Sequence, residues 1–173
     1  MPSARAHDVI TMALAPPTGA ATYLLTRSID LSILVTSAML FAGFMFGPDL
    51  DIQSKQYARW GPLGFLWWPY KVVFRHRSRF SHGLLLGTAI RVLYFTVVLG
   101  LLAGVGLLIY GWLHPHASRK PDATLLLQQV WDTLRAIERR YLVAAFLGLW
   151  WGATTHTLTD WLHGLWTITK RIF

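Results

Sequence analysis

The sequence predicts an all-α integral membrane protein, a helical bundle of about four apolar helices that run up and down, with one interfacial loop. Hydrophobic residues make up 54% of the 173 residues and charged residues only 14%, whereas soluble domains carry about a quarter charged residues. In addition, four segments contain almost no ionisable side chain, and a helix of roughly 20 apolar residues can cross a bilayer. The whole chain, 1–173, is expected to form one domain.

The four apolar segments are residues 9–26, 31–47, 84–113 and 141–155. The first is the weakest, because Pro16 and Pro17 interrupt it and are expected to kink its helix. The second is short, the third is the strongest and is interrupted only by Arg91, and the fourth continues as HTLTDWLHGLW. An interfacial loop rich in Trp, Pro and Arg is expected over residues 48–83, and an amphipathic helix over residues 123–140.

Two features of these segments concern the membrane surface. Arg91 is expected to extend its side chain back to that surface by snorkelling, with pairing to a buried carboxylate as the alternative. Trp67 and Trp68, next to Pro69, are typical of an aromatic anchor at the lipid–water interface.

An up-and-down arrangement places four polar motifs on the same face of the bundle. They are HD (7–8) before the first segment, PDLD (48–51) after the second, HRSRFSH (76–82) before the third and HTLTD (156–160) after the fourth. Every acidic residue expected on this face belongs to one of these motifs. Nine Lys and Arg residues are expected on this face and six on the opposite one, so the positive-inside rule indicates that the motif face is cytoplasmic.

Two of the motifs suit a divalent metal ion. His156 and Asp160 are four residues apart, so a helix presents both on one side, where an imidazole nitrogen and a carboxylate oxygen can bind the same ion. Asp49 and Asp51 can each supply an oxygen to one of two ions, or one can bind an ion while the other orients a ligand.

The other two motifs, HD (7–8) and HRSRFSH (76–82), each allow more than one interpretation. Asp8 follows His7 and could simply favour a helix N-terminus. His76 and His82 are six residues apart, which is poor helical spacing, so either part of this motif is loop or one histidine is not a ligand. The nearby arginines could hold a phosphate through forked hydrogen bonds or could form a basic loop near anionic headgroups. They are Arg75, Arg77 and Arg79.

Each motif alone also has a simpler interpretation, such as a solvated His/Asp pair or a Gly-Pro helix stop followed by solvated aspartates. These interpretations do not explain why four separated segments bring His and Asp to one face. Three or more such ligands around a divalent ion, with an open position for water, form a hydrolytic site, because the metal lowers the pKa of the water and stabilises developing negative charge. The carboxylates are numerous enough for two or three ions.

Together, HD near the N-terminus, FGPDLDIQSKQYARWGPL, HRSRFSHG and HTLTDW resemble a bacterial and cyanobacterial family of predicted metal-binding proteins of unknown function, over nearly the whole chain. The chain is more remotely similar to inner-membrane proteins described as metal-dependent hydrolases, and distantly to the zinc phospholipase C and single-strand nuclease superfamily. The resemblance implies one to three divalent ions, with zinc favoured over manganese and iron. The ligands it implies lie among His7, Asp49, Asp51, His76, His82, His156 and Asp160.

The expected function is a membrane-bound, metal-dependent hydrolase that acts on a phosphoester. A lipid or lipid-linked substrate is preferred, because a site at headgroup depth meets lipid phosphates without extracting them. Asp51 or Asp8 is expected to act as a base or to orient a ligand, and Arg77, or its neighbours Arg75 and Arg79, to hold the phosphate. The expected location is the bacterial inner membrane, crossed several times.

Three other functions compete with this expectation. A non-catalytic metal could tie helix ends together, or the protein could sense or move the metal; a closed four-ligand site would favour a structural role and an open one would favour chemistry. A compact, soluble-type helical enzyme whose apolar helices bury one another is the second alternative. Nucleic-acid binding is not expected, because the basic residues are split between two faces and no recognition motif is present.

Overall fold

The computed structural model describes residues 3–114 and 122–172, and in these ranges the chain forms helices and turns without a β-strand. The predicted all-α class is therefore confirmed for the described chain. The long helices are α1 (Ala4–Thr26), α2 (Ile29–Phe44), α5 (Leu86–Leu113), α6 (Ala123–Ala136) and α7 (Arg139–Ile172). Four short helices lie between α2 and α5: η1 (Pro48–Asp51), α3 (Lys55–Ala58), η2 (Gly61–Trp67) and α4 (Trp68–Val73).

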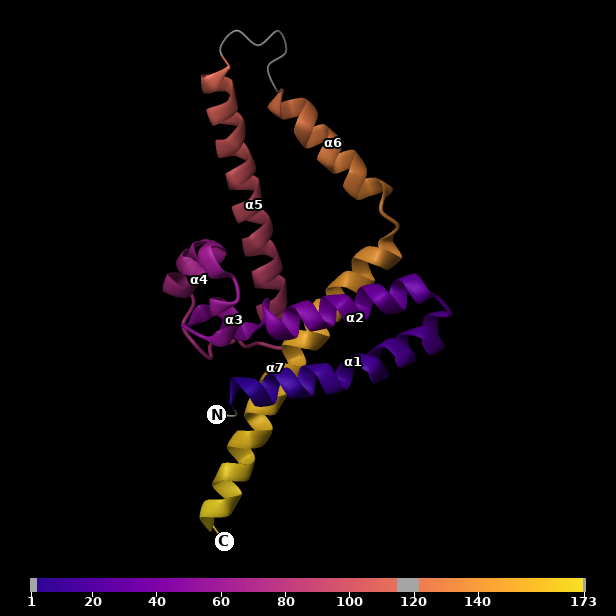
Figure 1. Cartoon of the computed structure of the whole chain (residues 1–173), viewed down its shortest axis with the longest axis vertical. Helices are drawn as coiled ribbons and strands as arrows, with labels where there is room; N and C mark the ends of the chain where they lie inside the picture. Colours follow the sequence, from indigo (N-terminus) through magenta and orange to yellow (C-terminus); the bar gives the residue numbers. More distant parts are fainter. Residues whose placement is uncertain (1–2, 115–121, 173) are drawn as a thin grey trace.

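Helices α1 and α2 form an antiparallel hairpin that lies across α7 (Figure 1). The turn between them is tight, because Arg27 adopts a left-handed conformation with φ of 54° and the hydroxyl of Ser28 caps the first turn of α2. The hydroxyl of Ser32 donates a hydrogen bond of 2.7 Å to the carbonyl of Gly19, which joins the two helices. Despite Pro16 and Pro17, α1 is one helix from Ala4 to Thr26.

Helix α7 crosses α2 at two glycines. Gly148 and Gly152 lie one turn apart on α7, and a Cβ atom at either position would collide with a backbone carbonyl of α2, that of Val35 or Met39 respectively. The Gly-x-x-x-Gly spacing allows two helix backbones to approach closely, as in many membrane helix pairs. This close crossing fixes the position of the following turns of α7, which carry His156 and Asp160.

The segment 48–83, expected as an interfacial loop, folds into the four short helices, which pack around a core of aromatic rings, followed by turns over residues 74–83. Trp67 is fully buried at the centre of this core, with 5.5 Å between its ring and that of Phe95 in α5, and 5.3 Å to the ring of Phe46. The expectation that Trp67 anchors the protein at the lipid interface is therefore wrong, because neighbouring aromatic side chains cover it. Trp68 remains largely exposed.

Only the first half of α5 packs against this aromatic core. Farther along α5, a Cβ atom at Gly100, Gly104 or Gly106 would have no neighbour within 4 Å, and the side chains of Leu101 and Leu108 are exposed. Helices α5 and α6 extend away from the α1–α2–α7 group (Figure 1). The expected up-and-down packing of four helices is thus replaced by a three-helix group with α5 standing apart.

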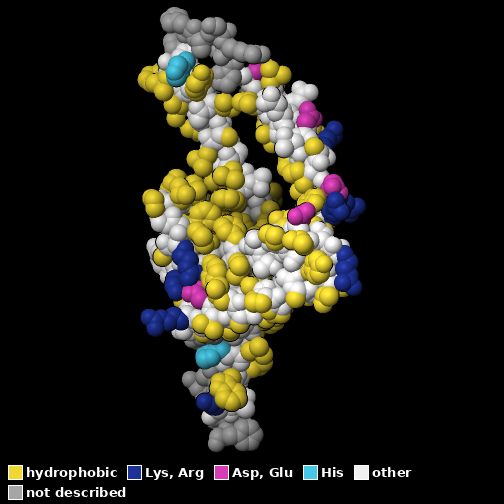
Figure 2. All heavy atoms as spheres, turned by 45° about the vertical axis from the view of Figure 1, so that its right-hand side comes forward, with side chains coloured by type: hydrophobic (Ala, Val, Ile, Leu, Met, Phe, Trp, Pro, Cys, Tyr) yellow, Lys and Arg dark blue, Asp and Glu magenta, His cyan; other side chains and the backbone are white. Residues whose placement is uncertain are grey.

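Two stretches of the described chain are long and apolar enough to cross a membrane, Ile29–Asp51 and Leu86–Leu113. Helices α1 and α7 do not meet that standard, so the predicted bundle of four membrane spans is not confirmed. The amphipathic helix expected over 123–140 is shorter, since α6 ends at Ala136 and Arg139 already begins α7. Hydrophobic side chains cover much of the face shown in Figure 2, whereas Lys and Arg side chains lie at its margins.

Candidate metal centre

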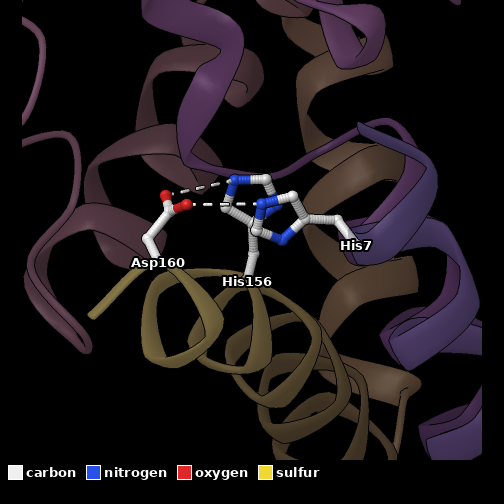
Figure 3. A group of neighbouring side chains, drawn as sticks. All are labelled: His7, His156 and Asp160. Carbon is white, nitrogen blue, oxygen red and sulfur yellow. Dashed lines mark ion pairs between the residues drawn. The ribbon is translucent and has the colours of Figure 1, made fainter. Parts of the chain in front are cut away.

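The first group of candidate ligands joins α1 to α7. His7 lies near the start of α1, and His156 and Asp160 lie one turn apart on α7, as their spacing predicts (Figure 3). The two imidazole rings stack with 3.9 Å between centroids, and oxygens of Asp160 lie 3.3 Å from His7 Nε2 and 3.8 Å from His156 Nε2. All three side chains are less than a tenth exposed. One cation could contact all three, because their ligand atoms lie within 4.8 Å of one another.

The second group joins η1 to the turns that precede α5. Asp49, His76 and His82 each place one ligand atom within 4.8 Å of the others. The two histidine rings meet edge to face, with 4.8 Å between centroids. The six-residue spacing of these histidines is spanned by turns rather than by helix, which is one of the two possibilities that the sequence left open.

Asp49 connects the two groups. Its Oδ1 lies 3.4 Å from His82 Nε2 in the second group, and its Oδ2 lies 3.2 Å from His156 Nε2 in the first. Each oxygen of one carboxylate therefore faces a different group. The six residues form one continuous cluster, referred to below as the His/Asp cluster: His7, Asp49, His76, His82, His156 and Asp160.

Asp51 lies behind the second group. Its side chain is fully buried, and its Oδ1 accepts a hydrogen bond of 2.9 Å from Nδ1 of His76. Because a carboxylate can only accept, Nδ1 of His76 is the donor in this hydrogen bond, and Nε2 is the ring nitrogen that is left to contact an ion. Buried carboxylates orient metal-binding imidazoles in this way in many metal sites. The geometry matches the second possibility for the Asp-x-Asp pair, one ligand and one carboxylate that orients a ligand.

Ser81 has a comparable relation to His82. Its hydroxyl donates a hydrogen bond of 3.1 Å to the carbonyl of Arg75 and lies 3.1 Å from Nδ1 of His82. These contacts hold the imidazole of His82 in one orientation. A polar side chain thus lies next to Nδ1 of each of these two histidines, Asp51 at His76 and Ser81 at His82.

Several cluster atoms fit a bound cation better than a hydrogen-bonded network. Asp49 Oδ1, His82 Nε2 and His156 Nε2 are buried without a hydrogen-bond partner in the described chain. Buried polar atoms without partners are rare in folded proteins, and an unseen ion is one physical reason for them. Imidazole nitrogens and carboxylate oxygens are ligands for zinc, iron and manganese. The donor set therefore fits a divalent metal.

The electrostatics of the first group favour an ionised carboxylate. Burial raises the pKa of the Asp160 carboxyl, but the imidazoles of His7 and His156 lower it by more, so the pKa lies below its ordinary value. Asp160 is therefore anionic at neutral pH and can bind a cation without first losing a proton.

Asp8, expected as a base or an orienting group, lies beside the cluster and not in it. Its Oδ2 accepts hydrogen bonds from Lys55 Nζ at 2.6 Å and Arg59 Nη2 at 2.7 Å. Burial raises the pKa of the Asp8 carboxyl, but the two cations lower it by more. The carboxylate is thus occupied by two basic side chains that the sequence did not single out.

Gln56 is a further residue that sequence reasoning missed. It is buried, its Oε1 accepts a hydrogen bond of 3.2 Å from the Asp49 backbone, and its Nε2 donates one of 2.8 Å to the Gly43 carbonyl. A Cβ atom on Gly47 would collide with this amide, so Gly47 does more than end a helix. A single glutamine in a polar segment carries no sequence signal of such a role.

Arg91 does not snorkel to the surface, so that expectation is wrong. Its side chain is 1% exposed, and its guanidinium donates hydrogen bonds of 2.7 Å to the Ser81 carbonyl and 3.2 Å to the Thr88 hydroxyl. The turn of Ser81 folds over the start of α5, so the two terminal nitrogens of the guanidinium find acceptors inside the protein. Arg91 consequently ties the turn that carries His82 to α5.

Two cavities reach the His/Asp cluster, and Asp160 lines both. The small cavity, of about 160 Å³, is lined by His7, Asp49 and His156 of the cluster and by Lys55 and Arg59. The large cavity, of about 810 Å³, is lined by His82 of the cluster and by Arg77, Arg79, Trp161 and Leu165. The cluster is therefore accessible from cavities of very different size.

Comparison with known proteins agrees with this chemistry. A family model described as "Uncharacterized metal-binding protein (DUF2227)" matches residues 2–170. The chain belongs to this metal-binding family. It is also 43% identical over 56 residues to a protein of Aquifex aeolicus (strain VF5) described as "Uncharacterized protein", a match that covers 32% of this chain and 39% of the relative. The chain thus matches less than half of the relative's length, and no solved structure matches.

Membership of the DUF2227 family confirms the predicted resemblance to metal-binding proteins of unknown function. With the two groups of ligands, it also supports a divalent metal ion. The matches do not show the remoter similarity to metal-dependent hydrolases, phospholipases or nucleases.

Proposed function

We propose that this protein is a membrane-bound hydrolase of phosphoesters that holds two divalent ions, zinc first among the candidates, at the His/Asp cluster. The position of Asp49 is the main support for two ions, because its two carboxylate oxygens face two separate groups of ligands. Counting Asp49 in both, the first ion would have four protein ligand atoms at most and the second three, and in each group three lie within mutual reach. Three-ligand zinc sites with a free position are the catalytic type, whereas structural sites have four protein ligands.

A pair of bound divalent ions would lower the pKa of water and stabilise charge on the attacking and leaving oxygens of a phosphoester. The side chains of the protein orient the metal ligands and place positive charge beside them. Asp51 and Ser81 hold His76 and His82 in one orientation. Lys55 and Arg59, fixed by Asp8, place positive charge in the small cavity beside the cluster. We therefore assign Asp8 to the placement of these cations rather than to proton abstraction.

The proposed membrane location is supported by α5. None of the most hydrophobic part of this helix is buried in the protein, although the core helix of a soluble protein would be covered by its neighbours. Lipid can cover a helix of 28 residues with this composition. The bacterial inner membrane, with the cluster on its cytoplasmic side, remains the prediction made from the distribution of Lys and Arg.

The experiment that tests the proposal combines metal analysis with a phosphoesterase assay on detergent-purified protein. We expect about two ions per chain, hydrolysis of a phosphoester such as phosphatidic acid, loss of hydrolysis after chelation, and its return with zinc. His156→Ala should lose both metal and activity, whereas His114→Ala, at an exposed histidine outside the cluster, should lose neither. Unchanged metal content in His156→Ala would contradict the proposed site. Full metal content without hydrolysis would favour the non-catalytic alternative.

A further inference from the structure

The large cavity has a basic wall and an apolar wall. Arg77 and Arg79 belong to the turns between α4 and α5, and Trp161 and Leu165 lie one turn apart on α7. The cavity also reaches Asp160 of the His/Asp cluster. A molecule in this cavity would therefore meet positive charge, hydrophobic surface and the candidate metal ligands at the same time.

The two arginines of the basic wall are available to a ligand. The side chains of Arg77 and Arg79 form no ion pair or hydrogen bond with a residue that the structure describes. In the small cavity, by contrast, Lys55 and Arg59 both bind Asp8. Guanidinium groups present forked donors that match phosphate oxygens. The large cavity is thus the place where an incoming phosphate can find unpaired arginines.

The apolar wall makes the cavity unsuitable for a bare phosphate ion. Trp161 is 56% exposed and Leu165 is 62% exposed, and burial of such side chains against an alkyl group removes apolar surface from water. An inorganic ion would leave this surface uncovered, and a neutral lipid would leave both guanidinium groups without a partner. A volume of about 810 Å³ accommodates a headgroup together with part of a chain.

We propose that the large cavity binds an amphiphilic phosphate, with the phosphoryl group at Arg77 and Arg79 and the alkyl part against Trp161 and Leu165. This inference rests on the proposed function and deepens it, since it assigns the two ends of the substrate to two walls of one cavity. It also makes the apolar wall a determinant of specificity that acts separately from the metal ligands.

Phosphonates test this inference without hydrolysis, because their carbon–phosphorus bond is not a substrate for a phosphoesterase. Titration calorimetry compares hexylphosphonate with methylphosphonate, which share a headgroup and differ in chain length. We expect hexylphosphonate to bind at least about tenfold more tightly, as five additional carbons become partly buried. The double variant Arg77→Ala/Arg79→Ala should weaken both phosphonates by roughly tenfold or more, whereas Arg135→Ala, at an exposed arginine of α6 outside the cavity lining, should not.

The apolar wall has a closely matched control on the same helix. Leu162 is 66% exposed, similar to Leu165, but lines a different groove between α1 and α7. Leu165→Ala should reduce the preference for hexylphosphonate by about threefold or more, and Leu162→Ala should leave it unchanged. Equal binding of both phosphonates, insensitivity to the double arginine variant, or equal effects at Leu162 and Leu165 would each overturn the inference. An inactive enzyme that still showed the expected binding would refute only the proposed function.

Discussion

The imidazole ring of His7 stacks on that of His156, with 3.9 Å between centroids and 16° between ring planes. Each ring carries nitrogens that can bind a metal ion, and the stacking holds both rings beside Asp160. His7→Phe preserves a flat ring for stacking and removes the nitrogens. We expect this variant to lose about one ion per chain while the melting temperature of the metal-free protein stays close to that of the parent. A large drop in the metal-free melting temperature would show that His7 is mainly a packing residue.

Replacement of Asp49 should remove about twice as many metal ions per chain as replacement of His7. Because its oxygens face both groups, Asp49→Ala removes a ligand from each, and we expect fewer than one ion per chain where His7→Phe keeps about one. Elemental analysis of the two variants, purified in parallel, makes the comparison. Equal metal content in both would mean that Asp49 serves a single ion.

Asp51 should act on metal affinity through His76. Replacing its buried carboxylate by an amide in Asp51→Asn weakens the hydrogen bond to His76 Nδ1, and loss of such orienting partners typically lowers metal affinity about 10- to 100-fold. Competition with a chelator of known affinity measures the change. Asp132→Asn, at an exposed aspartate of α6, is the control and should leave the affinity unchanged.

The ion pairs of Asp8 should make the stability of the folded protein depend on pH in the acidic range. The pKa of Asp8 is lowered in the folded state, so its stabilising contribution is present above the pKa of the unfolded chain, about 3.9, and is lost as the pH falls through the folded-state value. Thermal unfolding of metal-free protein between neutral pH and pH 3 should show this loss. Asp8→Asn should be less stable than the parent at neutral pH, and the difference should shrink on acidification; a constant difference would contradict the assignment.

The crossing of α7 over α2 should tolerate no side chain at Gly152. Gly152→Ala forces the helices apart and should cost about 1–3 kcal/mol, as overpacking of a tight contact does, and metal affinity should fall because His156 lies one turn farther along α7. Gly104→Ala, where α5 has open space, should instead be neutral or slightly stabilising, as alanine favours helix more than glycine. Denaturant unfolding and chelator competition on both variants give the comparison.

Much of the site could be predicted from the sequence because its residue types are unusual where they occur. His and Asp are conspicuous beside long apolar segments, and the four-residue spacing of His156 and Asp160 is correct for one helical face. The motifs also lie together, although the helices do not form the expected bundle. Proximity of the motifs needed only that the start of α1, η1, the turns before α5 and the middle of α7 meet, and several helix arrangements satisfy that condition.

The remaining features depend on contacts between distant residues that no local pattern reveals. Trp67 and Trp68 are adjacent and identical in type, but one is buried and the other exposed because only Trp67 meets the rings of Phe46 and Phe95. Arg91 interrupts an apolar helix, and whether it reaches water depends on where the turn of Ser81 folds. The pairing of Lys55 and Arg59 with Asp8 joins residues that are far apart in the chain.

The members of the His/Asp cluster come from the beginning, the middle and the end of the chain. An ion that binds only the folded protein adds its binding free energy to the free energy of unfolding, so its loss would loosen α1, η1 and α7 together. Starvation for the metal should therefore lower the abundance of this protein through proteolysis, and cells deprived of the ion would hold little intact apoprotein ready for reactivation.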